Sequence, residues 1–300
     1  YNGAAWSDRA APTYGGWTYP LAKVHAIAPD DAWAIPLAGT VAAHWNGAAW
    51  SLAVPDYGAE GRFYDVSAAD ANHVFIVGSH GQILHRTGGA WTLERKTESG
   101  PVSADLIQCV WADAGLNVVA ANNAYDLLRR EANGSWTVIK LMATLNNHSI
   151  WGRAAAEIYL IGTRGVRRVN PTTGAESVYT YDGAMRGTWE SAHGAGDRLF
   201  AVGAHGVVHE LALEGDGSVK LATLAVGKDL NLYFRMLGAV AHGDGSLLLF
   251  GDSYLNPGVV PVHIVDEAGA YPMDPLPLGM LTNSKARAVF ARSPDDLYLS

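Results

Sequence analysis

The sequence has almost no cysteine. Cys109 is the only one among 300 residues, so the chain can form neither an intrachain disulfide nor a zinc site built from several cysteines. The residues around it, 106–111, are mostly apolar, and we therefore predict a small buried side chain rather than a reactive thiol. This count leaves the cellular compartment open.

An excess of basic residues and long hydrophobic runs are also missing. Lys and Arg total 21 against 29 Asp and Glu, which argues against a nucleic-acid partner because such domains usually carry a basic excess. No apolar run approaches the ~18 residues of a membrane-spanning helix, and no basic and then apolar leader opens the chain. We predict no membrane span; a leader removed before Tyr1 is an open alternative.

The familiar catalytic motifs do not occur. The chain has no Gly-x-Ser-x-Gly elbow, P-loop, His-Glu-x-x-His or dinucleotide-binding fingerprint, so we predict no cofactor. Catalysis is not excluded, because a ring of repeated sheets can assemble an active site from single residues on different repeats.

What the sequence does contain is a repeat. Residues 24–33 align without a gap on residues 289–298, as in Pro-Asp-Asp at 29–31 and 294–296. The same register recurs at 66–75, 110–119, 150–159, 191–200 and 239–248. The starts run from 24 to 289 in six intervals, a mean spacing of about 44 residues, which fits units of four short strands.

Each unit reads as a four-stranded antiparallel meander. An apolar strand, a polar turn and a second strand lead to a glycine-framed turn at 78–81, 162–165 and 203–206. A third strand then leads through Asn-Gly or Gly-Gly to a fourth strand that opens with tryptophan. These tryptophans, which we expect to pack within the blades, are Trp50, Trp91, Trp136 and Trp6.

The two ends of the chain complement each other. Residues 1–6 copy residues 45–50, the end of a third strand and the start of a fourth, whereas the chain ends after a first and a second strand. Such an overlap closes a ring without unpaired edges. We predict an all-β, seven-bladed β-propeller in one domain, 1–300, with residues 1–7 beside the strands 288–292 and 296–300. The blades are expected at about 20–57, 61–100, 104–143, 145–184, 187–227, 233–280, and 285–300 with 1–10.

The repeat unit resembles the divergent propeller repeats of bacterial extracytoplasmic proteins, which are grouped with WD-repeat, YVTN and sialidase-like BNR propellers. The chain departs from sialidases in lacking the Asp-box and from WD-repeats in lacking the Gly-His and Trp-Asp pair in register. The resemblance therefore implies architecture and no specific activity. Many such proteins are binding or assembly factors, so it implies a scaffold that is secreted, periplasmic or on the cell surface.

One face of the predicted ring gathers the candidate binding residues. Turns between second and third strands share this face with the connections between blades, and their aromatic and arginine side chains are typical of interfaces. The turns contribute His80, Asn123, Arg164, His205, Asp252 and Tyr254. The connections contribute Tyr14, Trp17, Tyr19, Tyr57, Arg62, Arg186, Tyr233, Phe234 and Arg235.

Recurring polar residues are expected to be structural. His44, His85 and His209, with Arg130 in blade three, recur near the end of the third strand, whereas a catalytic residue is needed only once. The inner-strand residues Trp111 and Trp151 follow the same logic, although some inner-strand side chains could line the central channel. His80, His205 and Asp252 hold similar turn positions, but metal ligands must converge within about 2 Å of one ion, and blades two and five lie far apart. We predict no metal site.

Two functions are compatible with these patterns. The first is a noncatalytic binding or assembly module that holds a protein or a glycan on the turn-rich face. The second is a carbohydrate-active hydrolase or lyase in the central funnel, with acid and base roles for His80, His205, Asp252 or Glu190. Convergence of those side chains on one ligand would separate the two.

Overall fold

The computed structural model describes most of the first 223 residues and, as backbone, selected strands beyond them. The described residues are 12–14, 17–18, 21–36, 39–53, 61–97, 105–142, 147–162, 165–180, 189–195, 198–203, 208–216, 218–223, 234–241, 247–253, 262–266, 269–272, 289–293 and 296–299. Within these residues every regular element is a β-strand except one short 3-10 turn, η1 (Ser79–Gly81). The predicted all-β class is confirmed.

Most strands form four-stranded antiparallel meanders in chain order, which we number as blades. Blade 1 contains β3 (Leu21–Ala28), β4 (Asp31–Pro36), β5 (Ala42–Trp45) and β6 (Trp50–Ala53). Blade 2 contains β7 (Phe63–Asp70), β8 (His73–Gly78), β9 (Ile83–Thr87) and β10 (Ala90–Arg95). Blade 3 contains β11 (Ile107–Ala112), β12 (Val118–Asn122), β13 (Leu127–Arg130) and β14 (Trp136–Ile139).

The later blades have the same plan. Blade 4 contains β15 (Asn147–Ala154), β16 (Glu157–Gly162), β17 (Gly165–Val169) and β18 (Glu176–Thr180). Blade 5 contains β19 (Trp189–Ala195), β20 (Arg198–Gly203), β21 (Val208–Leu213) and β22 (Val219–Thr223). Blade 6 contains β23 (Phe234–Ala241), β24 (Leu247–Ser253), β25 (Val262–Asp266) and β26 (Gly269–Pro272). Two pairs remain: β1 (Thr13–Tyr14) with β2 (Trp17–Thr18), and β27 (Val289–Ser293) with β28 (Asp296–Leu299).

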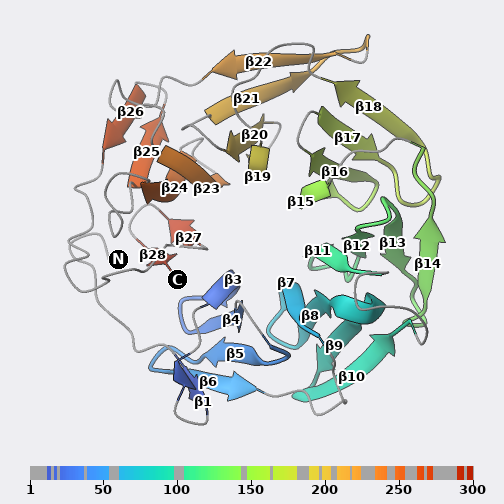
Figure 1. Ribbon diagram of the computed structural model, residues 1–300, viewed down its shortest axis with the longest axis vertical. Coiled ribbons are helices and arrows are strands. Elements are labelled where there is room, and N and C mark those ends of the chain that lie inside the picture. Colours follow the sequence, from blue (N-terminus) through green and yellow to red (C-terminus); the bar gives the residue numbers. More distant parts are fainter. Residues whose placement is uncertain are drawn as a thin grey trace.

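The sheets stand around a common centre, with the first strand of each nearest the middle (Figure 1). The first strands contact one another in the order β3, β7, β11, β15, β19, β23 and β27, and β27 also contacts β3. The pair β27–β28 therefore occupies the position between blade 6 and blade 1. The predicted pairing of residues 1–7 with this hairpin lies outside the described residues.

The second strand of a blade is its most buried strand. In β8, Val74, Phe75, Ile76 and Val77 are all wholly buried, because the strand lies between the inner and outer strands and both of its faces pack on neighbouring blades. Such a strand reads as a continuous apolar run instead of an alternating one. The hydrophobic core consequently lies between blades, as in the cluster that joins Trp33 of blade 1 to Val66 of blade 2.

Inner-strand tryptophans pack on glycines of the next blade. Trp111 lies on Gly152, and Trp151 lies on Gly194, so a Cβ at either glycine would overlap the indole ring. These glycines are needed for close packing of neighbouring inner strands rather than for an unusual backbone conformation. The structural role predicted for Trp111 and Trp151 is confirmed.

The predicted burial of Cys109 and the recurring histidines is largely confirmed. Cys109, His85 and His209 are buried, whereas the His44 side chain is 30% exposed. The predicted equivalence of these positions is wrong in part. His44 and His85 pair with the second-strand rings Trp33 and Phe75, but His209 pairs with Ala201, one residue out of that register. The residue equivalent to His85 in blade 3 is Arg129, and Arg130 points to the other face.

Candidate binding face

The turn between β8 and β9 has an unusual backbone. Gly78 donates its N–H to the carbonyl of Gln82 (3.1 Å), which closes the loop around Ser79, His80 and Gly81. His80 has φ 56° and Gly81 has φ 63°, so two successive residues are left-handed. A positive φ is uncommon for residues other than glycine, although histidine adopts it more often than most, and such strain persists only where surrounding contacts impose it.

Both neighbouring connections hold this turn. From the preceding side, Ser79 N–H donates to the Arg62 carbonyl (2.9 Å), and Arg62 N–H donates to Ser79 Oγ (3.2 Å). From the following side, Thr97 N–H donates to the His80 carbonyl (2.8 Å), and Gly81 N–H donates to the Asp105 carbonyl (2.6 Å). The backbone of the turn is therefore fixed by hydrogen bonds at three successive residues.

The Asp105 carboxylate strengthens the same arrangement. Its Oδ2 accepts hydrogen bonds from Arg95 Nη2 (2.9 Å) and Thr97 Oγ1 (2.6 Å), while Arg95 Nη1 donates to the Gly81 carbonyl (2.8 Å). Burial raises the pKa of Asp105, but the hydrogen bonds from Thr97 and Arg95 outweigh it and hold the pKa below its usual range. A Cβ at Gly81 would overlap these side chains, so only glycine fits there.

Blade 3 repeats this clamp with different residues. Asn123 N–H donates to the Leu106 carbonyl (2.9 Å), and Leu106 N–H donates to Asn123 Oδ1 (3.0 Å), as Ser79 and Arg62 do in blade 2. Tyr125 has φ 67° and takes the place of Gly81. Two adjacent turns on one face are thus held by the same pair of hydrogen bonds.

The described part of this face carries aromatic and basic side chains. Arg62 is exposed, and its guanidinium lies 4.5 Å from the centroid of the Tyr64 ring. His80, Asn123 and Tyr125 are half-buried at the turn tips. Two of these aromatic residues are not among the predicted ones. Tyr64 lies within β7, and Tyr125 aligns with Gly81, so a tyrosine in a glycine position was the signal for it.

The other predicted site residues are described only in part. The register of blade 6 places Arg235 opposite Asp252, on β23 and β24, and Trp17 lies in β2 opposite Tyr14. Phe234 begins β23. Seven of the candidate binding residues lie outside the described residues: Tyr19, Tyr57, Arg164, Arg186, His205, Tyr233 and Tyr254.

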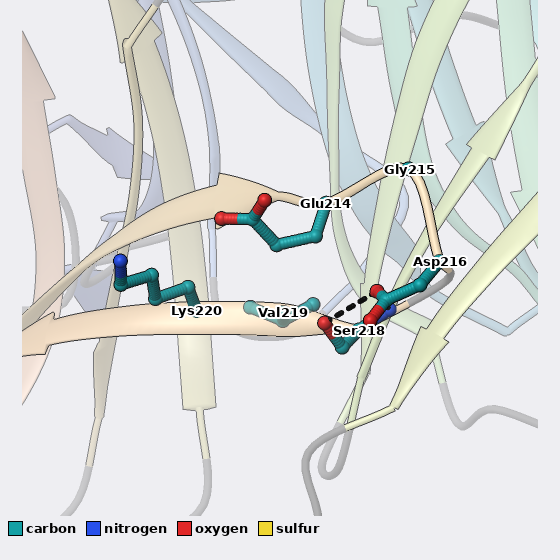
Figure 2. A pocket seen from close by; sticks show the side chains of 6 residues that line it. All are labelled: Glu214, Gly215, Asp216, Ser218, Val219 and Lys220. Atoms are coloured by element: carbon teal, nitrogen blue, oxygen red, sulfur yellow. Dashed lines mark hydrogen bonds between the residues drawn. The ribbon is translucent and has the colours of Figure 1, made fainter.

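A hollow of about 620 Å³ lies beside the β21–β22 hairpin (Figure 2). All the residues that line it belong to that hairpin, from Glu214 to Lys220. Asp216 Oδ1 accepts hydrogen bonds from the Ser218 N–H (2.9 Å) and Oγ (2.6 Å), which fixes the turn. The hollow is the concave side of a single surface hairpin and does not bring residues of different blades together.

The described residues contain neither a metal-binding cluster nor a membrane-spanning helix. No group of three His, Cys, Asp or Glu side chains in the described ranges could hold a metal ion. No helix in the same part of the chain is long and apolar enough to cross a membrane.

The chain matches no protein-family model and no curated protein sequence. Solved structures do resemble it. A structure of YCF48 bound to D1 peptide has 14% identity and a TM-score of 0.70, over 94% of this chain and 88% of that one. The WD40 repeats of RRP9 have 11% identity and a TM-score of 0.69, over 91% and 84%. A catalytically inactive virginiamycin B lyase from Staphylococcus aureus with quinupristin has 10% identity and a TM-score of 0.67, over 93% of both chains. At such identities the likeness concerns the fold, and by its fold the chain is a divergent β-propeller repeat protein.

Proposed function

We propose that this protein is a noncatalytic binding or assembly module that holds a protein or glycan partner on the face of the turns 78–82 and 122–126. The observation that carries the proposal is the repeated clamp, in which Ser79 and Asn123 tie two adjacent turns to the connections before them. A face ordered in advance loses little conformational entropy when a partner binds. The left-handed backbone at His80 and Tyr125 supports a binding role, since strain of this kind collects at functional sites.

The partner would contact residues of the kind that dominate binding energy. Arg62, Tyr64, His80 and Tyr125 combine a cation, two phenol rings and an imidazole within neighbouring blades, and Tyr and Arg are enriched among binding hot spots. We propose that the face continues around the ring through the remaining predicted positions: Trp17, Tyr19, Arg164, Arg186, His205, Tyr233, Arg235, Asp252 and Tyr254. The peptide bound to the structurally similar YCF48 gives this proposal support from the fold.

The proposal that a protein binds this face can be tested by cross-linking and by affinity capture of the partner from the native source. His80→Asn preserves the left-handed backbone, because asparagine tolerates that conformation, but removes the imidazole. Arg62→Gln removes the charge of an exposed side chain. We expect each variant to lose at least about ten-fold in affinity for a captured partner, the effect of a typical hot spot.

The matched control is Lys220→Gln, an exposed cation on the β21–β22 hairpin at the opposite end of the strands (Figure 2). It should leave the affinity unchanged. Equal capture by wild type, His80→Asn and Arg62→Gln would refute the proposed face. A glycan array probed with the same proteins tests the other class of partner in the same way.

The second candidate is a hydrolase or lyase acting on a carbohydrate in the central funnel. A lyase with a similar fold supports it, as does the register that places Arg235 opposite Asp252. It requires acid and base groups from His80, His205, Asp252 or Glu190 to meet at one ligand. Loss of turnover in Asp252→Asn, with unchanged capture of the partner by the turn face, would favour this candidate.

We also propose that the ring has seven blades within one domain, 1–300, with residues 1–10 completing the blade of β27 and β28. The contacts of β27 with both β23 and β3 support this closure. Deletion of residues 1–10 should lower the melting temperature of the whole domain, because an inter-strand closure would be lost. An unchanged melting temperature would refute it. The resemblance to extracytoplasmic propellers supports an extracytoplasmic location, which fractionation of the native cells would test.

A further inference from the structure

A cleft of about 290 Å³ lies between blades 4 and 5. It is at the end of the strands opposite to the turn 78–82, beside the β15–β16 turn. Blade 4 supplies its charged and aromatic wall, which includes Arg153, Glu157 and Arg168. Blade 5 supplies an apolar floor that includes Leu199, Leu211 and Leu213.

The cleft exists because one arginine is replaced by leucine. Between blades 1 and 2, Arg86 lies 4.9 Å from the centroid of Trp33, and between blades 2 and 3, Arg130 lies 5.6 Å from the centroid of Phe75. In each case a third-strand arginine covers the second-strand ring of the preceding blade.

The corresponding ring between blades 4 and 5 is Tyr159. It pairs with Arg168 as Phe75 pairs with His85. The covering position belongs to Leu211, which pairs with Leu199 as Arg86 pairs with Val74. Leucine is several atoms shorter than arginine. Leu211 therefore packs with Tyr159, which is only 6% exposed, and the cleft lies beyond these two side chains.

Two guanidinium groups share one carboxylate at this cleft. Glu157 Oε1 accepts a hydrogen bond from the Tyr159 hydroxyl (2.6 Å) and pairs with Arg168 Nε (3.0 Å), while its Oε2 lies 3.9 Å from Arg153 Nη1. The Arg153 and Arg168 side chains are 40% and 50% exposed. The charged residues that line the cleft therefore sum to one positive charge, in a chain whose net charge is −8.

The aromatic side chains give the cleft a flat wall. Tyr159 stacks on Trp151 with 5.5 Å between ring centroids and 29° between planes. Burial and the neighbouring Glu157 raise the pKa of Tyr159 to about 12, so its hydroxyl remains a neutral donor to Glu157. An apolar group can thus lie against Trp151 and Leu213, which line the cleft and are half-buried.

We propose that this cleft binds a small organic carboxylate that carries an aromatic or branched apolar group. The carboxylate would pair with Arg168 and Arg153, whose planar guanidinium groups suit carboxylates, and the apolar group would lie against the half-buried Trp151 and Leu213. The site is independent of the partner-binding face, because it lies at the other end of the strands.

The proposal can be tested with 3-phenylpropionate and, as the uncharged control, 3-phenylpropionamide. Binding is followed by NMR through the indole N–H of Trp151, assigned with Trp151→Phe. We expect the carboxylate to shift this signal with a dissociation constant of about 1 mM, which is typical for a ligand of this size. The amide should bind at least about ten-fold more weakly, because it cannot form an ion pair with the guanidinium groups.

Three variants of the cleft and one control variant test the proposal further. Arg168→Gln should weaken binding about ten-fold, and Glu157→Gln should strengthen it because the cleft gains a positive charge. Lys140→Gln, which removes an exposed cation paired with Asp126 at the other end of the strands, is the matched control and should change nothing. Leu211→Arg should close the cleft by supplying the arginine found in blades 2 and 3.

Several results would overturn the proposal. These are equal binding of the acid and the amide, an unchanged affinity in Arg168→Gln, or shifts that spare the Trp151 signal. If Leu211→Arg does not fold, as judged by its melting temperature, Arg168→Gln and Glu157→Gln still decide, since both change polar side chains at the rim of the cleft.

Discussion

The Glu94 carboxylate connects blades 2 and 3, and its removal should weaken the whole domain. Glu94 Oε1 accepts hydrogen bonds from His85 Nδ1 (2.8 Å) and Arg130 Nη2 (2.7 Å), and Oε2 accepts one from Trp136 Nε1 (3.0 Å). The side chains of Glu94 and Arg130 are only 10% and 12% exposed. Since Arg130 and Trp136 belong to blade 3, three side chains of two blades depend on one carboxylate.

Glu94→Gln keeps the shape of this side chain and removes its charge. The guanidinium of Arg130 then loses its counter-charge in a poorly hydrated place, and the amide nitrogen of glutamine meets donors instead of an acceptor. Removal of one partner of a buried ion pair lowers the free energy of unfolding by about 3–5 kcal/mol. Because this pair has partial access to water, we expect a loss of about 2–4 kcal/mol. We expect urea titrations to show that loss in the free energy of unfolding.

Glu131→Gln is the matched control. Glu131 pairs with Arg129 (2.6 Å) just beyond the end of β13, but both side chains are substantially exposed, at 33% and 27%. Exposed pairs contribute little, so this variant should unfold like the wild type. Equal losses in Glu94→Gln and Glu131→Gln would refute the argument that burial and the inter-blade contacts give Glu94 its importance.

The pH dependence gives an independent check. Burial raises the pKa of Glu94, but hydrogen bonds from His85, Arg130 and Trp136 outweigh it and lower the pKa from 4.5 to about 2. Because the folded-state pKa is the lower one, the stabilisation is complete above about pH 4.5 and is lost as the pH falls towards 2. It amounts to about 1–2 kcal/mol after solvent screening. The stability difference between wild type and Glu94→Gln should shrink over this range, and a constant difference would contradict the assignment.

Three further predictions concern the inner strands. Gly194→Ala should destabilise the fold by about 1–3 kcal/mol in urea titrations because its Cβ would overlap the Trp151 ring, whereas Gly215→Ala, where a Cβ meets nothing within 4 Å, should not. Cys109 should react with Ellman's reagent only after unfolding, because burial raises the pKa of its thiol; rapid reaction of the native protein would contradict this. Burial and a neighbouring imidazole lower the pKa of His25 from 6.5 to about 4, so its NMR titration should have a midpoint near pH 4, and its contribution to stability should be lost as the pH falls from 6.5 towards 4.

The four-stranded unit could be predicted from the sequence because every copy must meet the same structural requirements. A strand buried on both faces needs an apolar run, and a tight hairpin needs residues that tolerate positive φ, as Gly47, Gly89 and Gly134 do. These demands recur at a fixed spacing, so seven weak signals reinforce one another.

The register within the third strand could not be predicted in the same way. Side chains alternate between faces, and a shift of one residue exchanges the two faces. His209 and Arg130 were aligned with His85, but each differs from it in register by one residue and therefore lies on the other face of its blade. Arg130 in fact faces blade 2 and binds Glu94, and His209 accepts a hydrogen bond from Trp189 Nε1 (3.2 Å).

The turn positions of His80 and Asn123 could be predicted from the sequence, whereas the hydrogen bonds that hold these turns could not. The alignment placed His80 and Asn123 at turn tips, since turn residues can be recognised locally. The sequence did not predict that the Ser79 and Asn123 side chains accept hydrogen bonds from backbone N–H groups 17 residues earlier in the chain. Hydrogen bonds between such distant segments leave no local sequence pattern. The left-handed Tyr125 did have a local signal, because it aligns with Gly81, but the reason that a tyrosine is held there is the fixed backbone around it.

Differences between blades, more than the repeat itself, carry the specific chemistry of this protein. Repetition supplies one backbone position opposite each second-strand ring, and the residue found there determines whether the space between two blades is closed. Arg86 and Arg130 close it with a guanidinium over a ring, whereas Leu211 packs with Tyr159 at the bottom of the cleft between blades 4 and 5. Neighbouring blades also differ at the turns on the other face, where blade 2 has Gly81 and blade 3 has Tyr125 at the equivalent position. In a ring of similar units, the positions at which one copy breaks the pattern without loss of packing are therefore the positions at which binding sites should be sought.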